Sequence, residues 1–210
     1  MSKSRVNLVR RGDGVLVEAT LVDGVEPSDL IVVERAWTAV RARLIGRLRA
    51  ASVPRSEWPE SWHWNWEQKA PQLQLLAARG FGILSEEDWQ GLILLKTAPY
   101  VAHIEQDRGR PLVYVDYLEV APWNWRIPAL GEEGQYKGIG SILFREAVNL
   151  SFQEGFHGRI GLHALPQAET FYENACGMTA IGRDSKKQNL IYFEFSREQA
   201  QKFLQKGGDS

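Results

Sequence analysis

Apolar residues recur every three or four positions along one stretch near the N-terminus, and arginines fill many of the positions between them. This spacing is typical of an amphipathic helix with one buried face. The residues on that face are Val33, Trp37, Val40, Leu44 and Leu48. Just before the stretch, Ser28 or Asp29 is available as a helix cap. We therefore expect a helix that begins at residue 28 or 29 and ends near residue 52.

Shorter apolar segments, separated by turn residues, predict the other elements. The expected strands are 6–8, 14–21, 81–84, 91–95, 112–121, 159–163, 178–182 and 190–195. The expected further helices are 70–78, 141–153, 167–176 and one that follows a capping box at Ser196 and Gln199. Segment 97–104 is ambiguous, and a further strand is the alternative there.

The strand expected at 112–121 is apolar on both of its alternating faces, which is typical of a central strand covered on both sides. Strands and helices are mixed along the rest of the chain, and no repeat or low-complexity linker divides it. We therefore expect a mixed α/β fold in a single domain that spans residues 1–210.

The composition is that of a soluble globular protein, because 44% of the 210 residues are hydrophobic and 24% are charged. The formal net charge of −1 makes a nucleic-acid partner unlikely on general grounds, although arginines gather between residues 41 and 55. A single cysteine, Cys176, excludes an intrachain disulfide. The sequence has no N-terminal signal pattern and no membrane-length apolar run, so we expect a cytoplasmic protein without a membrane partner.

A glycine-rich turn from Gly134 to Gly140 joins the expected central strand to the helix expected over 141–153. Backbone N–H groups at the start of a helix, together with the helix dipole, bind anions such as phosphate. The dinucleotide-binding fingerprint needs a third glycine, and a Walker motif needs Gly-Lys-Ser/Thr; neither is present. The turn therefore predicts a phosphate site of another kind, with a plain connecting turn as the alternative.

The pattern Gln-x-x-Gly-x-Gly, from Gln135 to Gly140, resembles the pyrophosphate loop of the GNAT acyltransferases. The order of the expected elements resembles that family as well. The resemblance implies a GNAT-type acyl-CoA N-acyltransferase fold, with a central mixed, splayed β-sheet flanked by helices. It also implies an acceptor-side half at 1–110, an acyl-CoA-binding half at 111–195, and a C-terminal helix and tail at 196–210.

The resemblance further implies acetyl-CoA as co-substrate and no metal. It assigns the pyrophosphate to the loop residues Gln135, Tyr136, Lys137, Gly138, Ile139, Gly140 and Ser141. It assigns the pantetheine arm to free main-chain groups of Leu118, Glu119 and Val120, which pair with it like an added strand. A buried strand that simply ends at Pro122 is the alternative for this second segment.

The string from Ala168 to Glu173 resembles the Ala-x-x-x-Tyr helix of the family. The resemblance implies that the hydroxyl of Tyr172 protonates the departing thiolate. Two positions depart from the family pattern: Leu165 stands where an asparagine is usual, and Gly177 follows Tyr172 by five residues rather than four. A core tyrosine without a catalytic role is the alternative.

Glu119 is the preferred base for removing a proton from an acceptor amine, because similar GNAT enzymes often place a glutamate on this strand. Asp116, His63 and a water chain are the alternatives. In a regular strand Glu119 and Asp116 lie on opposite faces, so at most one of them faces the acceptor. His163 also titrates in the useful range, but a lone histidine is more often structural. Cys176 is expected to be a packing residue.

Tryptophans crowd into two segments, at 58–66 and at 123–125. In the GNAT order the first segment overhangs the acceptor pocket. The residues that we expect to bind a flat or cationic acceptor are Trp62, His63, Trp64 and Trp123. The alternative is that the tryptophans pack a satellite core.

Together these features predict an acetyltransferase that moves an acetyl group from acetyl-CoA to a primary amine by direct transfer in a ternary complex. A small-molecule amine is the expected acceptor. Two alternatives stay open: a non-catalytic acyl-CoA-binding module, and an acetyltransferase that acts on a protein or on an aminoacyl-tRNA amine. The chain is also compatible with a homodimer. A fold-level resemblance identifies the donor only.

Overall fold

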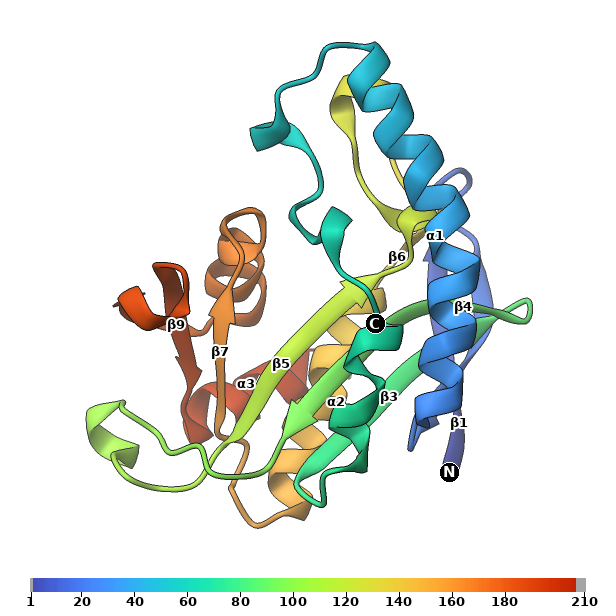
Figure 1. Ribbon diagram of the computed structural model, residues 1–210. Coiled ribbons are helices and arrows are strands. Elements are labelled where there is room, and N and C mark those ends of the chain that lie inside the picture. The colour runs from blue at the N-terminus through green and yellow to red at the C-terminus, as the bar shows by residue number, and fades with distance from the viewer. Residues whose placement is uncertain (1, 207–210) are drawn as a thin grey trace. The chain divides into compact units, whose positions relative to one another are not determined.

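The computed structural model describes residues 2–206 and contains a mixed nine-stranded sheet with flanking helices (Figure 1). The expected mixed α/β class with a mixed sheet is therefore confirmed. The chain divides into two compact units. The first unit comprises Met1–Ile93 and Leu118–Leu143, and the second comprises Leu94–Tyr117 and Phe144–Ser210. The expected subdivision of a single domain remains a prediction, and its C-terminal tail at 207–210 lies outside the described residues.

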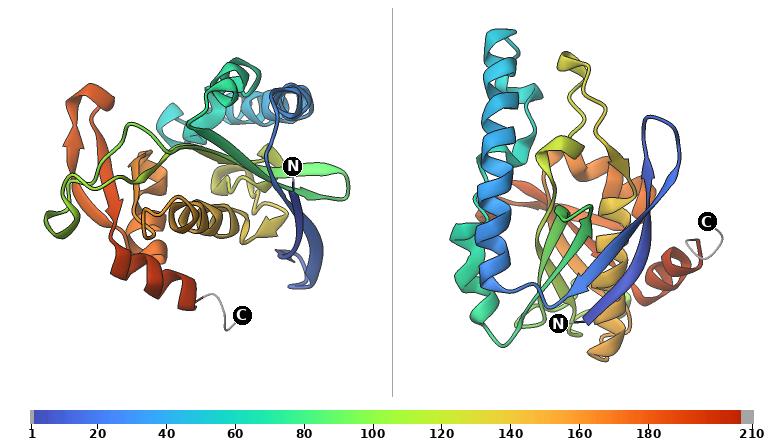
Figure 2. Two further views of the ribbon diagram at one scale, coloured as in Figure 1. Left: turned by 90° about the horizontal axis from the view of Figure 1, so that it is seen from below. Right: turned by 90° about the vertical axis from the view of Figure 1, so that its right-hand side faces the viewer.

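The first unit contains an antiparallel run of strands in the order β6-β1-β2-β3-β4. Its strands are β1 (Ser2–Arg10), β2 (Leu16–Asp23), β3 (Ala78–Ser85), the first six residues of β4 (Asp88–Lys96), the end of β5 (Val113–Val120) and β6 (Tyr136–Lys137). β1 and β2 form a long hairpin, drawn in blue in Figure 2. The segments expected at 6–8 and 14–21 predicted both strands, but the short β6 lies inside the glycine-rich turn and was not expected.

The long amphipathic helix is confirmed as α1 (Pro27–Ala50), which buries the apolar face expected from the sequence. Its expected cap was wrong, because the N-terminal boundary residue is Glu26. Pro27 takes the first helical position, where its missing N–H costs nothing. The carboxylate of Asp29 then accepts a hydrogen bond from the Glu26 N–H at 2.8 Å. Asp29 thus caps the helix from within its first turn rather than from outside.

The second helix expected at 70–78 was also wrong. The chain instead forms a 3₁₀ helix, η3 (Glu67–Gln74), and has already entered β3 at Ala78. Pro71 lies inside η3 and cannot donate the backbone hydrogen bond that an α-helix needs, which favours the tighter and shorter turn. Two further 3₁₀ turns, η1 (Arg55–Glu57) and η2 (Glu60–His63), carry the tryptophan-rich segment.

The second unit contains the strand order β5-β7-β9-β8, with β7 (Ile160–Ala164), β8 (Thr179–Asp184) and β9 (Leu190–Phe195). It also holds most of α2 (Ile139–Gln153), together with α3 (Arg197–Lys206). Its short helical turns are η4 (Glu105–Asp107), η7 (Pro166–Ala168), the π-helix η8 (Phe171–Cys176) and η9 (Ser185–Lys187). The ambiguous segment 97–104 forms no strand and contributes only an isolated bridge from Val101 to Pro111.

The core of the second unit is aromatic. Phe144 of α2 contacts Tyr172, Phe195 and Phe203, with ring centroids 5.4–5.9 Å apart. The expected capping box of α3 is confirmed, because the Ser196 N–H donates to the Gln199 side chain at 2.9 Å and the Gln199 N–H to the Ser196 hydroxyl at 3.3 Å. The cap and the aromatic cluster together fix α3 against its own unit.

The parallel pairing between β5 and β7 is short. Among the described residues it joins Val113, Tyr114 and Val115 to residues 160–162 and reaches no further. Both strands continue beyond the last pair, while β7 keeps pairing with β9 as far as Ala164. The pairing of the two strands thus ends at Val115, five residues before the end of β5, which agrees with the expected splay of the sheet.

The loop that follows β5 belongs to the first unit and contains the 3₁₀ turns η5 (Pro122–Asn124) and η6 (Pro128–Leu130). Ile127 bridges to Glu132, and the loop packs on the C-terminal half of α1. The buried residues of this cluster are Leu44, Ile45, Leu48, Trp58, Trp125 and Ile127. Glu132 also forms an ion pair with Arg47 of α1. The loop is thus an ordered part of the first unit.

Gly134 ends this loop with a φ of +78°, in the left-handed region. A Cβ there would lie 2.5 Å from the carbonyl oxygen of Asn124. Gly131, in the same loop, has a φ of +68° but open space around its Cα. Substitutions at these two glycines therefore distinguish two costs. A side chain at Gly131 strains the backbone only, whereas one at Gly134 also collides with Asn124.

We predict that Gly131→Ala lowers the free energy of unfolding by about 1 kcal/mol, because only the left-handed conformation is penalised. Gly134→Ala should cost about 3 kcal/mol or more, because the added methyl group also displaces the Asn124 backbone. Urea unfolding of both variants measures the difference. Equal losses would show that the contact with Asn124 does not constrain the turn.

Candidate functional site

The glycine-rich turn is held in place by part of its own backbone. The Gln135 N–H donates to the Trp123 carbonyl at 3.1 Å, and the Tyr136 N–H donates to the Asn124 side-chain oxygen at 3.0 Å. Tyr136 and Lys137 form β6, which pairs with β1. The N–H groups of Gln135 and Tyr136 are therefore occupied, and these residues position the turn rather than offer donors to a ligand.

The next four N–H groups are different. Those of Gly138, Ile139, Gly140 and Ser141 donate to no acceptor among the described residues, because the first backbone bond of α2 runs from Ile142 to Gly138. Gly138 has a φ of +92°, which lets the chain turn sharply into the helix. Four adjacent orphan donors at the positive end of a helix form an anion site. Within the predicted phosphate loop, the unpaired donors therefore all lie in the second half, from Gly138 to Ser141.

Two buried amides support the turn. Asn124, which accepts the Tyr136 N–H, donates through Nδ2 to the carbonyl and side-chain oxygens of Gln90, at 3.3 and 3.0 Å. The indole N–H of Trp123 donates to the same Gln90 side-chain oxygen at 2.8 Å. Gln90 and Asn124 are 3% and 5% exposed, so each lost bond would leave a buried polar group unpaired. Sequence reasoning missed both residues.

A groove of about 270 Å³ opens beside the turn within the first unit. Arg43 and Arg47 of α1 line it, together with Trp123 and Gln135 of the loop that follows β5. Glu132 and Glu133 also line it, so the groove carries charges of both signs. Two of the predicted site residues, Trp123 and Gln135, are thereby brought together at the turn.

Glu119 lies at the end of β5 and is 3% exposed. Its Oε2 accepts a hydrogen bond from the Trp66 indole N–H at 2.6 Å. Its Oε1 is buried and accepts no hydrogen bond within the described structure. The neighbouring Leu118 and Val120, whose main chain is predicted to meet the pantetheine arm, are half-buried.

Burial raises the pKa of Glu119 to about 7, against the opposing influence of the Ser61 hydroxyl, the Arg41 charge and the Trp66 indole. A carboxyl group that titrates near neutral pH can take up a proton and release it again under physiological conditions. Glu119, the preferred base from the sequence, acquires this property through its burial.

Behind Trp66 lies a buried ion pair. Glu34 accepts the Trp66 backbone N–H at 2.7 Å and pairs with Arg41 at 3.1 Å. Arg41 also donates to the Trp64 carbonyl, yet its Nε and second Nη atoms are buried without a partner. These two nitrogens and Glu119 Oε1 are polar atoms that a ligand or water can satisfy.

The tryptophans divide between packing and the site. Trp62 packs edge-on against Trp58 at 5.6 Å and against His63 at 5.7 Å, and it joins the cluster on α1. Lys69 lies over the Trp64 ring at 5.2 Å. Trp123 meets Trp37 edge-on at 6.3 Å and is half-buried. Trp58 and Trp125 are therefore buried in a satellite core. The residues expected to bind the acceptor, Trp62, His63, Trp64 and Trp123, are each at least partly exposed.

Tyr172 lies in the second unit and is 7% exposed. Its ring packs on Phe144 at 5.9 Å and on Phe193 at 6.4 Å. Burial raises the pKa of Tyr172, so the phenol stays protonated across the neutral range. A protonated phenol in an apolar wall can act as a proton donor.

The helix that carries Tyr172 is a π-helix, η8, and explains one departure noted in the sequence. The N–H groups of Gly177 and Met178 both donate to the Tyr172 carbonyl, which is a wider turn than an α-helix makes. A π-turn accommodates one extra residue, so Gly177 ends the helix at five residues from Tyr172 with a φ of +80°.

The other candidates have separate surroundings. Asp116 pairs with Lys96 at 2.6 Å, and His63 is exposed. Cys176 is buried, and burial raises the pKa of its thiol to about 12, which suits a packing role. Within residues 2–206 no group of three or more His, Cys, Asp or Glu side chains is arranged to hold a metal, and no helix is long and apolar enough to cross a membrane.

No protein-family model matches the sequence, and no curated protein matches it either. Solved structures do match. FeeM, an N-acyl amino acid synthase from uncultured soil microbes, has a TM-score of 0.50 and 15% identity over 86% of this chain and 91% of its own. A putative GNAT acetyltransferase from Desulfovibrio desulfuricans has a TM-score of 0.52 and 14% identity over 85% of this chain and 99% of its own. The chain therefore has the GNAT fold, as its loop pattern predicted.

We predict that Glu119 makes stability pH-dependent. The folded state keeps its proton up to about pH 7, whereas the unfolded chain releases it near the ordinary value of 4.5. The contribution is thus complete below pH 4.5 and is lost as the pH rises through 7. The difference of about 2.5 pKa units corresponds to about 3 kcal/mol.

Urea unfolding of the wild type and of Glu119→Gln at several pH values between 4.5 and 8 tests this. The free energy of unfolding of the wild type should fall relative to the variant by roughly that amount. Glu57→Gln, at an exposed position of η1, is the control and should follow the wild type at every pH. A constant gap between wild type and Glu119→Gln would contradict a raised pKa.

Proposed function

We propose that this protein is an acyl-CoA-dependent N-acyltransferase that moves an acetyl group to a primary amine of a small molecule. The observation that carries the proposal is the set of four unpaired N–H groups at Gly138–Ser141, at the N-terminus of α2. They suit the diphosphate of a coenzyme A thioester, because the backbone donors and the helix dipole favour the same charge. The GNAT fold provides the context in which such a turn binds this donor.

The proposed roles of the chain follow from the surroundings of each residue. The loop from Gln135 to Ser141 holds the diphosphate, with its first half fixing the turn and its second half donating. Main-chain groups of Leu118–Val120 orient the pantetheine arm as an added strand would. Because a thioester is already activated, most of the rate gain comes from positioning.

Two side chains move protons in the proposed reaction. Glu119 accepts a proton from the acceptor ammonium, for which a pKa of about 7 is well matched. Tyr172 donates a proton to the departing thiolate and remains a phenol until then, because burial raises its pKa. The acceptor amine attacks the thioester carbonyl directly, so no acyl-enzyme is formed and Cys176 takes no part.

The proposed acceptor is a small molecule bound near Trp62, His63, Trp64 and Trp123. FeeM, whose fold is similar, is described as an N-acyl amino acid synthase, which supports an acceptor of that size. A non-catalytic acyl-CoA-binding module is the second candidate. It would keep the turn but would not release free thiol when acetyl-CoA is mixed with amines. We also propose that the protein acts in the cytoplasm.

Binding of coenzyme A should depend on the turn. Gly138→Ala forces a side chain into a backbone with a φ of +92° and should weaken the affinity for coenzyme A by about tenfold. Gly109→Ala, at a φ of +76° in open space, is the matched control and should bind like the wild type. Calorimetry measures both. Pantetheine, which lacks the diphosphate, should bind at least tenfold more weakly than coenzyme A.

If pantetheine and coenzyme A bind equally well, the turn does not hold the diphosphate. If neither binds to the wild type at millimolar concentration, the proposed donor is wrong.

Tyr172→Phe should lower kcat for thiol release by a factor of about 10² or more, because general acid catalysis is lost. The Kd of acetyl-CoA should stay within about twofold, since the ring and its packing on Phe144 are retained. Thiol release with a panel of primary amines gives kcat, and calorimetry gives Kd. An unchanged kcat would remove Tyr172 from the mechanism, and a parallel loss of affinity would assign it to binding.

A further inference from the structure

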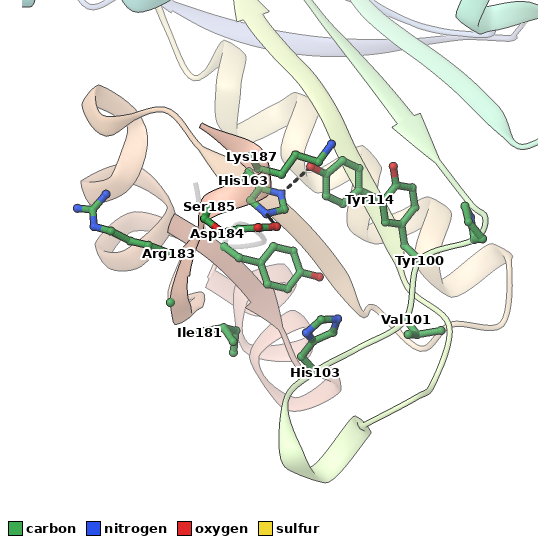
Figure 3. Close-up of a pocket in the computed structure, with 13 residues that line it drawn as sticks. Tyr100, Val101, His103, Tyr114, His163, Ile181, Arg183, Asp184, Ser185 and Lys187 are labelled. Atoms are coloured by element: carbon green, nitrogen blue, oxygen red, sulfur yellow. Dashed lines mark hydrogen bonds and ion pairs between the residues drawn. The ribbon is translucent and has the colours of Figure 1, made fainter. Parts of the chain in front are cut away.

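The second unit contains a cavity of about 540 Å³ that none of the roles above uses. Segment 99–103 lines one wall, and the β8–β9 hairpin lines another (Figure 3). Tyr114 of β5, His163 of β7 and Tyr192 of β9 form the floor. A volume between about 300 and 1,000 Å³ is typical of small-molecule sites.

Aromatic rings form much of the walls. Tyr100 stacks on Tyr114 with ring centroids 4.1 Å apart and an angle of 8° between the planes. His163 lies 4.8 Å from Tyr192, and His103 lies 5.4 Å from it on the other side. Glu194, which is buried, accepts the N–H groups of His103 and Ile104 at 2.6 and 2.7 Å and fixes segment 99–104 to β9. A flat or apolar ligand group fits between such rings.

Three polar groups form a hydrogen-bonded chain at the floor. His163 Nε2 lies 3.2 Å from the Asp184 carboxylate, and His163 Nδ1 lies 2.8 Å from the Tyr114 hydroxyl (Figure 3). The Lys186 backbone N–H, above all, lowers the pKa of Asp184, so Asp184 is ionised and can only accept. Burial lowers the pKa of His163, with a further lowering from Lys187 and His103 that opposes the raising by Asp184.

These conditions fix the direction of each hydrogen bond. Neutral His163 places its single proton on Nε2, facing Asp184, and leaves Nδ1 as an acceptor. The Tyr114 O–H must then donate to Nδ1. The remaining lone pair of the Tyr114 oxygen is an acceptor only, so at this point the cavity selects a ligand that donates an N–H or O–H.

A cation completes the site. Lys187 lines the same cavity from η9, is exposed, and forms no ion pair or hydrogen bond within the described structure. Arg183 also lines the cavity, but its guanidinium donates to the Asn189 carbonyl at 3.0 Å. Asp184 is engaged by His163 and by the Lys186 N–H. Among the described residues of the lining, the two cations Arg183 and Lys187 are not paired with a carboxylate, and Lys187 is the one without a hydrogen-bond acceptor, which favours an anionic group on the ligand.

We propose that this cavity binds an α-amino acid with an aromatic side chain, whose ammonium donates to the Tyr114 oxygen and whose carboxylate pairs with Lys187. The side chain lies against the rings of Tyr100, Tyr114 and Tyr192. The inference goes beyond the proposed function, because it gives the bound amino acid no part in the acyl transfer. The binding itself is independent of any transfer.

Calorimetry with the full chain at pH 7.5 and no acyl-CoA tests the site with three probes. L-Phenylalanine carries both charged groups, phenethylamine lacks the carboxylate, and 3-phenylpropionate lacks the amine. L-Phenylalanine should saturate, and each of the other two should bind at least about tenfold more weakly. Equal binding of all three probes, or no binding of L-phenylalanine at millimolar concentration, would overturn the proposal.

Two lysines offer a matched pair of variants. Lys187→Met should weaken L-phenylalanine binding about tenfold and leave phenethylamine binding unchanged, because only the carboxylate contact is lost. Lys186→Met, at the neighbouring exposed position that does not line the cavity, should leave both affinities unchanged. Both side chains are exposed, so neither change threatens folding. Equal effects of the two variants would refute the assigned carboxylate contact.

Asp184→Asn tests the direction of the hydrogen-bonded chain. An asparagine amide that donates to His163 Nε2 moves the imidazole proton to Nδ1, so that Tyr114 no longer has to donate there. The preference for L-phenylalanine over 3-phenylpropionate should then shrink about tenfold or more. Nitrogen-15 NMR of the His163 ring, assigned with His163→Gln, should show the proton on Nε2 in the wild type. A proton on Nδ1 there would overturn the chain as drawn.

The outcomes separate this inference from the proposed function. If L-phenylalanine binds as described but no primary amine in the panel releases thiol from acetyl-CoA, the site stands and the transfer is wrong. If amines are acylated while Lys187→Met and Asp184→Asn change neither binding nor selectivity, the transfer stands and the assignment of the cavity is wrong.

Discussion

The hydrogen bond from the Tyr136 N–H to the side chain of Asn124 is the constraint on which the candidate donor site depends. This bond fixes the first half of the glycine-rich turn. The Asn124 side chain is itself held by two hydrogen bonds to Gln90. With Gln135 and Tyr136 committed in this way, the following four N–H groups are left unpaired at the start of α2. A turn without this support would be free to satisfy those donors itself, so the buried amides help to keep these four N–H groups unpaired.

Burial raises the pKa of both proposed proton-transfer groups, with different consequences for their chemistry. Glu119 is an acid whose charged form is disfavoured, so its pKa rises into the neutral range, where it can exchange protons. Tyr172 is already neutral, and burial only keeps it so. The same desolvation thus makes one side chain reactive near pH 7 and preserves the other as a donor. In the cavity of the second unit, the ionised Asp184 instead determines which atoms of His163 and Tyr114 donate.

Local patterns predicted most of the elements. The spacing of Val33 and Trp37 with the later apolar residues defined α1, and Ser196 with Gln199 defined the start of α3. The failures came where one residue overrode a pattern. Pro71 turned an apparent helix into η3, and Asp29 capped α1 from inside the first turn. The spacing of apolar residues alone does not reveal that proline lacks a backbone N–H donor, or that a side chain bonds back to the start of its own helix.

The sequence by itself determined the mixed fold and the glycine-rich turn between a central strand and a helix, because both depend on neighbours along the chain. Its resemblance to the GNAT family supplied the candidates Glu119 and Tyr172. Only the tertiary structure decided which turn donors stay unpaired, how far burial shifts the pKa of Glu119, and that η8 absorbs an extra residue. It also brought Tyr114, His163 and Asp184 together from three separate strands. Hydrogen bonds and desolvation depend on residues that are far apart in the sequence but close in space. A local sequence pattern does not show which of these residues meet.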